Sequence, residues 1–109
     1  MKKAYRVRKN EEFAQIIGKK HSFSSACFVV YFDQKKLDNA RIGISVSKKL
    51  GDAVERNKIK RQVREMCYSL VDFDNCSKDL IVIVRKGYLN NDFFNNKNDL
   101  EILIKKAII

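Results

Sequence analysis

Residues 41–64, RIGISVSKKLGDAVERNKIKRQVR, pass from a strand pattern through a glycine-containing loop into a basic helix. Apolar residues alternate with small or polar ones over 40–47, which predicts a strand with one apolar face. The loop spans 48–54, and a helix is predicted from there to about residue 71. Lys and Arg outnumber Asp and Glu by eight to two in this stretch. Such an excess of positive charge indicates a surface that meets phosphate.

The segments before this stretch predict a helix and a strand. Residues 1–9 are basic and are expected to be loosely ordered. Asn10 is a suitable N-cap for a short helix that ends near Gly18. The segment 24–33, rich in β-branched and aromatic residues, predicts a strand that pairs with 40–47 as an antiparallel hairpin. A short additional strand at 22–24 is weakly indicated.

The segments after it complete the predicted fold. Residues 79–85, DLIVIVR, form a nearly continuous apolar run, which is typical of a strand covered on both faces. An Asn-rich segment then leads to a final helix over 98–108. The predicted fold class is α+β, in the order α-β-β-(β)-α-β-α. It forms a single-domain, two-layer sandwich with a mixed sheet over residues 1–109.

The composition points to a polyanionic partner and away from several other classes. The 109 residues include 23 Lys and Arg and 13 Asp and Glu, a formal charge of +10. This excess favours nucleic acid through attraction and counterion release. No secretory signal or membrane-length apolar run is evident. Three cysteines without metal-ligand spacing and a single histidine make a zinc site improbable and predict free thiols in a reducing cytoplasm.

The central helix is predicted to carry its charge on one side. Successive residues of a helix are about 100° apart, and this spacing places the apolar residues on one stripe and the basic ones on a neighbouring arc of roughly 140°. The stripe comprises Ile59, Val63, Met66, Cys67 and Leu70. The polar arc comprises Arg56, Asn57, Lys60, Arg61 and Arg64. A solvated face is the ordinary explanation of a charge run. Here like charges stack at i,i+4 at some cost, and nucleic-acid binding is favoured.

The same residues carry a family resemblance. The pattern R-x-G-x-S-V-S-K-K-x-G-x-A-V-x-R-N-x-x-K-R over 41–61 resembles the signature of the bacterial ribonuclease P protein subunit. KNEEF at 9–13, FVVYF at 28–32 and DLIVIVRKG at 79–87 extend the likeness over most of the chain. The resemblance implies a left-handed β-α-β crossover through the basic helix. General principles alone would predict the right-handed form, which occurs in about 98% of such connections.

The resemblance also implies a function in which the protein is not the catalyst. It implies an RNA-binding subunit that assembles with a catalytic RNA and assists removal of the 5′ leader from precursor tRNA. The Mg²⁺ ions would be held mainly by the RNA, and no catalytic or metal-binding residue, membrane or obligate protein partner is implied. The expected RNA-subunit surface consists of Lys48, Lys49, Arg56, Asn57, Lys60, Arg61 and Arg64. The expected leader cleft consists of Lys9, Phe13, Ile17 and Tyr31.

Two alternatives stay open on the sequence alone. A stand-alone nuclease would need metal-binding carboxylates or a histidine pair, whereas His21 has no partner histidine and Asp72 and Asp74 are expected in a polar loop. A general RNA-binding module would explain the charge equally well but not the long signature. In the cleft, Phe13 could instead be an ordinary core residue, and Ile17 stands where the family often has an aromatic residue.

Overall fold

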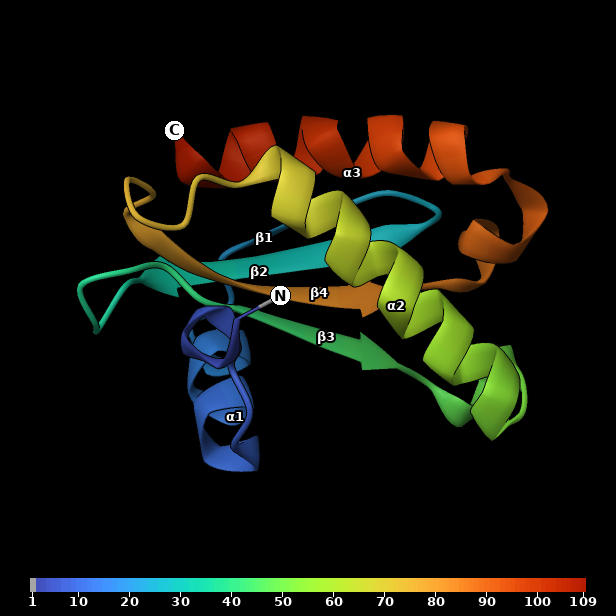
Figure 1. The fold of residues 1–109 in the computed structure, drawn as a ribbon, viewed down its shortest axis with the longest axis horizontal. Helices are drawn as coiled ribbons and strands as arrows, with labels where there is room; N and C mark the ends of the chain where they lie inside the picture. The colour runs from blue at the N-terminus through green and yellow to red at the C-terminus, as the bar shows by residue number, and fades with distance from the viewer. Residues whose placement is uncertain (1) are drawn as a thin grey trace.

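The computed structural model describes residues 2–109 as one four-stranded mixed sheet with three α-helices (Figure 1). The element order confirms the predicted sequence of helices and strands, including the short strand at 22–24. The described residues also contain three 3₁₀ turns: Lys3–Tyr5 before the first helix, and Lys48–Leu50 and Lys86–Asn90 between later elements. The elements are α1 Asn10–Gly18, β1 Ser22–Ser24, β2 Phe28–Gln34, β3 Ile42–Val46, α2 Ala53–Leu70, β4 Lys78–Val84 and α3 Phe93–Ile108.

The strand order is β1-β2-β4-β3, so the predicted hairpin between the strands at 24–33 and 40–47 is wrong. β4 lies between β2 and β3, antiparallel to β2 and parallel to β3. The connection 35–41 crosses to the far side of β4. It is hydrogen-bonded to the segment that precedes β4, because Lys35 N donates to Ser77 O and Ala40 N donates to Phe73 O. The apolar run of β4 favours this central place because both of its faces are then covered.

The β3-α2-β4 unit has a left-handed crossover. In Figure 1, α2 lies in front of the sheet, β3 and β4 both point to the right, and β4 lies above β3. If the strands are turned to point upwards, β4 stands to the left of β3 with the helix towards the viewer. This confirms the hand that the family resemblance implies, against the strong general preference for the opposite hand.

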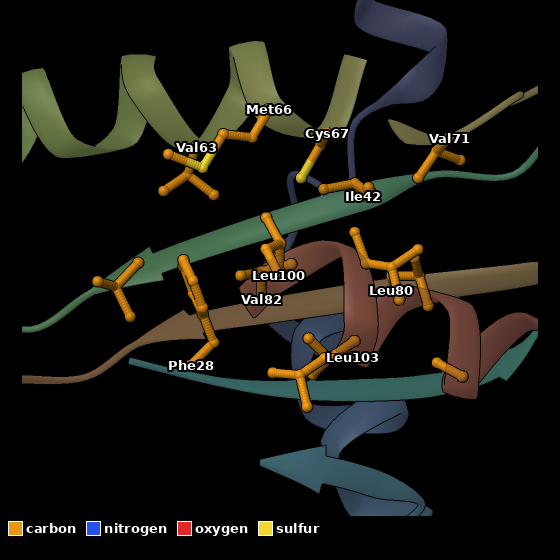
Figure 2. Packing of buried hydrophobic residues seen from close by; sticks show 14 of the residues in the cluster. Phe28, Ile42, Val63, Met66, Cys67, Val71, Leu80, Val82, Leu100 and Leu103 are labelled. Carbon is orange, nitrogen blue, oxygen red and sulfur yellow. The ribbon is translucent and has the colours of Figure 1, made fainter. Parts of the chain in front are cut away.

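The main core lies between the sheet and the layer formed by α2 and α3. Figure 2 shows Val63, Met66 and Cys67 of α2 above Leu80 and Val82 of β4, beside side chains of α3. The predicted α2 stripe is therefore confirmed, with Leu70 only partly buried at its end. The three cysteines are free and buried, and burial raises the pKa of the Cys67 thiol to about 12.

The opposite face of the sheet is covered in part by α1. Ile16 of α1 and Ile81 of β4 are buried there, and Ile83 is partly buried. Leu80 and Val82 point to the main core, so β4 alternates between two apolar surroundings. The prediction that this strand is covered on both faces is thus confirmed.

Residues 2–9 are docked on the sheet, which corrects the expectation of a loose N-terminal arm; Met1 lies outside the described residues. Arg6 forms a parallel bridge with Ile42, and the buried Val7 donates its N–H to Ile42 O at 2.9 Å. Tyr5 stacks on Phe73 with ring centroids 4.5 Å apart. These contacts are long-range in sequence, and the arm's own composition does not indicate them.

Helix boundaries differ modestly from the prediction. Lys9 rather than Asn10 is the N-cap of α1, without a side-chain cap. α2 begins with a capping box, in which Asp52 accepts from Glu55 N and the Glu55 carboxylate accepts from Asp52 N. α3 begins at Phe93, five residues before the predicted start. Its first turns contain the buried Asn96, which donates to Tyr88 O at 3.0 Å. Because this buried residue is polar, the hydrophobic pattern does not indicate the start of the helix.

Candidate nucleic-acid interface

The polar arc of α2 faces away from the core. Arg56, Lys60 and Arg64 are half-buried, and Asn57 and Arg61 are exposed. The orientation follows from burial of the apolar stripe against the sheet. Within residues 2–109, side-chain ion pairs form only between Arg41 and Glu12, Arg41 and Asp79, and Lys105 and Glu101. The positive charge of this arc is therefore not neutralised by ion pairs within the described protein.

Lys48 and Lys49 lie on the 3₁₀ turn that precedes α2 and are both exposed. The Ser47 hydroxyl accepts from Lys49 N at 3.2 Å and caps this turn. Lys49 lines a hollow of about 330 Å³ together with Arg85 and Lys86, which follow β4. The structure thus joins Lys49 to two further basic residues beyond the predicted set. Neither Lys48 nor Lys49 lines either of the two other hollows, both of which include Arg64.

Two hollows adjoin the exposed side of α2 and the N-terminal arm, and together we call them the basic groove. The wider hollow has a volume of about 780 Å³, and the narrower one about 290 Å³. The wider hollow is lined by Lys2, Arg6, Arg61, Arg64, Glu65, Tyr68 and Ser69. The narrower one is lined by Arg6, Val7, Arg8, Phe13, Ile42, Ile44 and Arg64. Lys2, Arg6 and Arg8 were missed as site residues because the basic arm gave no sign of where it docks.

The electrostatics of the groove reflect its crowding with positive charge. Partial burial lowers the pKa of Arg64, and the nearby charge of Arg6 lowers it further. Glu65 is the one acidic residue among those lining either hollow. Arginine presents a planar fork of donors that matches phosphate oxygens. The groove is therefore chemically suited to a phosphodiester backbone.

Three of the four expected leader-cleft residues come together on the α1 side of the sheet. Phe13, Ile17 and Tyr31 are partly buried and pack against the same small cluster, which contains Ile16 and Ile81. Phe13 also lines the narrower hollow of the basic groove, whereas the other two do not. The exposed Lys9 lies at the start of α1, where its carbonyl accepts from Phe13 N at 3.1 Å.

The Phe13 ring lies directly against Gly43 of β3. A Cβ built on Gly43 would stand 2.5 Å from Phe13 Cζ and 2.7 Å from Ile81 Cδ1. Real Cβ atoms do not approach other heavy atoms so closely. Glycine at this position therefore allows the aromatic ring to lie against the sheet.

A buried ion-pair network fastens α1 to the sheet. Arg41 is only 7% exposed and donates to Glu12 Oε2 at 2.6 Å and to Asp79 Oδ2 at 3.2 Å. Asp79 also accepts from Arg41 N at 2.9 Å. The bond from Arg41 lowers the pKa of Glu12, the residue that directly precedes Phe13. Arg41, the first residue of the basic stretch, is thus a structural anchor and not part of the phosphate-facing surface.

None of the candidates for acid–base chemistry lines either hollow of the basic groove. His21 is exposed at the start of β1, and Asp72 and Asp74 are exposed in the loop between α2 and β4, as predicted. Asp74 accepts from the Tyr5 hydroxyl at 3.2 Å. No group of three or more His, Cys, Asp or Glu side chains within residues 2–109 could hold a metal ion. Over the same residues, no helix has the length and apolarity needed to cross a membrane.

The fold and the basic groove define the class: a small α+β nucleic-acid-binding protein built on one mixed sheet. The family model for Ribonuclease P matches residues 1–108. The chain therefore belongs to the ribonuclease P protein family.

Sequence relatives and solved structures agree with this assignment. The ribonuclease P protein component of Staphylococcus aureus is 45% identical over 108 residues, 98% of this chain and 93% of the relative. That of Listeria welshimeri is 42% identical over 106 residues, 96% and 89% of the two chains. The S. aureus RNase P protein structure has a TM-score of 0.86 at 43% identity, covering 98% of this chain and all of that one. The Thermotoga maritima protein has a TM-score of 0.76 at 31% identity, covering 92% and 96%.

Proposed function

We propose that this chain is the RNA-binding subunit of a bacterial ribonuclease P and assists a catalytic RNA in removing the 5′ leader from precursor tRNA. The observation that carries the proposal is the unneutralised basic face of α2 beside an aromatic cleft, in a member of this family. The protein has two surfaces, one for the RNA subunit and one for the leader.

The RNA-subunit surface comprises the basic residues of α2 and of the turn before it. Its residues are Lys48, Lys49, Arg56, Asn57, Lys60, Arg61 and Arg64. Each phosphate that a Lys or Arg neutralises releases condensed counterions, so affinity falls steeply with salt. Asn57 adds an amide that both donates and accepts, which suits sugar and base edges.

The leader surface comprises Lys9, Phe13, Ile17 and Tyr31. Single-stranded RNA binds proteins by stacking its bases on aromatic rings, at about 1–3 kcal/mol per base, while basic groups follow the backbone. Phe13 and Tyr31 are half-buried, so part of each residue is accessible to a ligand. Ile17 offers an aliphatic contact, and the exposed Lys9 offers charge at the start of α1.

The chemistry of cleavage belongs to the RNA in this proposal. Mg²⁺ prefers clustered oxygen ligands, whereas the basic groove is lined mainly by arginine and lysine with Glu65 as its one acid. These residues do not fit a protein-borne magnesium site, and we assign no catalytic step to a side chain. Precursor tRNA is the substrate, the catalytic RNA is the partner, and the cytoplasm is the compartment where they meet.

Reconstitution tests the proposal. The protein is combined with a bacterial ribonuclease P RNA, and leader removal from precursor tRNA is measured at low Mg²⁺ with and without protein. We expect cleavage to increase strongly when the protein is present. No increase over RNA alone would refute the assignment. Cleavage by protein freed of all RNA would indicate a stand-alone nuclease, and unchanged precursor levels after depletion in cells would indicate a general RNA-binding module.

The two surfaces are separated by substitution. Arg61→Ala should weaken binding to the RNA subunit and reduce the slope of log affinity against log salt by about one unit. Tyr31→Ala should leave that binding intact and reduce the preference of the assembled enzyme for precursor over mature tRNA. If both variants had the same effect in the two assays, the two-surface arrangement would be wrong.

A further inference from the structure

Arg6 and Arg64 are the residues shared by the two hollows of the basic groove. The wider hollow extends from them towards Arg61 on the exposed side of α2. The narrower one extends from them to Phe13, on the α1 side of the sheet. The pair therefore stands where the basic face of α2 meets the aromatic cleft.

The two guanidinium groups have no acidic partner among the described residues. No ion pair within residues 2–109 includes Arg6 or Arg64. The narrower hollow adds Arg8 and contains no acid. Both shared arginines are half-buried, and each is close enough to the other for repulsion to lower the pKa of Arg64. An anion bound between two like charges would offset the repulsion between them.

The fold fixes the backbone positions of both arginines. Arg6 bridges to Ile42, its N–H donates to Lys3 O at 3.1 Å, and the next residue, Val7, is buried. Arg64 follows Val63, which is fully buried in the main core. The arm and α2 are thus anchored independently to the sheet, so the backbone segments that carry Arg6 and Arg64 are in position before any ligand arrives. A backbone that is already ordered lowers the entropic cost of binding.

We propose that Arg6 and Arg64 together bind one backbone phosphate of the precursor leader, at the point where the strand passes from the cleft beside Phe13 to the basic face of α2. This inference rests on the proposed function and adds to it the path of the leader. A single strand is favoured as the occupant because the narrower hollow combines charge with the apolar side chains of Phe13, Ile42 and Ile44. Apolar and aromatic groups interleaved with charge suit unpaired nucleotides.

The test uses the assembled enzyme and a set of precursor tRNAs, each with one neutral methylphosphonate linkage in the leader. With the wild-type protein, we expect one linkage position, or two adjacent ones, to weaken precursor binding by about 5- to 20-fold, because a charge-assisted contact is lost. With Arg6→Ala or Arg64→Ala, the penalty at that position should fall to less than about 2-fold. Lys3→Ala is the matched control, since Lys3 is exposed on the same arm and lines neither hollow.

Arg6→Lys and a thermal melt of each variant keep the test independent of folding. An Arg6→Ala or Arg64→Ala protein that melts like the wild type and still shows the full penalty would overturn the inference, whereas Arg6→Lys keeps the charge and should retain part of the penalty. The inference would also be overturned if Arg6→Ala weakened binding of mature and precursor tRNA equally, because the phosphate would then belong to another RNA segment. Leader-independent binding by the wild-type enzyme would instead refute the proposed function, so the two failures are distinguishable.

Discussion

Gly43→Ala should displace the Phe13 ring from the sheet and damage the cleft. The new Cβ would stand 2.5 Å from Phe13 Cζ, 2.7 Å from Ile81 Cδ1 and 2.9 Å from Phe13 Cε1. Three contacts this short on two buried or half-buried side chains cannot be relieved by a small shift of one flexible atom. Overpacking of this kind costs about 1–3 kcal/mol. For a domain of this size, that lowers the melting temperature by at least about 4 °C.

Gly18→Ala is the matched control for this substitution. Gly18 ends α1, and a Cβ there would meet nothing within 4 Å. Alanine in a helix is favoured over glycine by about 0.5–1 kcal/mol. We expect Gly18→Ala to melt at or slightly above the wild-type temperature, while Gly43→Ala melts below it.

Urea unfolding and tRNA binding measure the two consequences of Gly43→Ala. The free energy of unfolding should fall, and the assembled enzyme should lose preference for precursor over mature tRNA, with its binding to the RNA subunit preserved. The double variant Phe13→Leu with Gly43→Ala should recover part of the stability, because the smaller side chain removes two of the three contacts. A Gly43→Ala protein as stable as the wild type, with unchanged leader preference, would refute the reasoning.

Two further predictions concern titratable groups. Glu12→Gln removes a charged acceptor of the buried Arg41 and should lower stability at pH 7 by about 1–3 kcal/mol. Because the pKa of Glu12 is lowered in the folded protein, its contribution is present above the ordinary value of 4.5 and is lost as pH falls through the folded pKa. The difference between wild type and Glu12→Gln in urea should therefore shrink below about pH 4; a constant difference would contradict this. Burial raises the pKa of Cys67 to about 12, so this thiol should resist disulfide reagents at pH 8 until the protein unfolds, and mass spectrometry showing rapid native labelling of Cys67 would contradict this.

The hydrophobic pattern of each segment predicted the helices and strands well, because the spacing of apolar residues within a segment identifies its buried face. The stripe of Val63, Met66 and Cys67 follows from helical spacing alone and is buried as expected. The same spacing places the polar arc of α2. Where a buried polar residue interrupts the pattern, prediction is wrong: Asn96 lies in the core through its bond to Tyr88 O, and the start of α3 was placed five residues late.

Relations between distant segments were not predictable in the same way. The pairing of β2 with β4 depends on a central strand that lies more than forty residues further along the chain. Arginine is a residue type that commonly binds phosphate, so the sequence does not reveal that Arg41 is a structural anchor. Its ion pairs with Glu12 and Asp79, which are distant in sequence, show this role. The docking of Arg6 beside Arg64 was unpredictable for the same reason, since the residues of the N-terminal arm do not specify which strand it joins.

The uncommon hand of the β3-α2-β4 connection decides which face of the sheet stays accessible. With the positions and directions of β3 and β4 fixed, the hand depends solely on the side over which the helix crosses. A redesigned chain with the common hand would keep the same strand order but would lay α2 over the surface that holds Phe13 and Tyr31. That helix would compete sterically with α1 for the sheet and leave no room for an RNA strand. The unusual topology is therefore a precondition for placing the two proposed recognition surfaces on so small a protein.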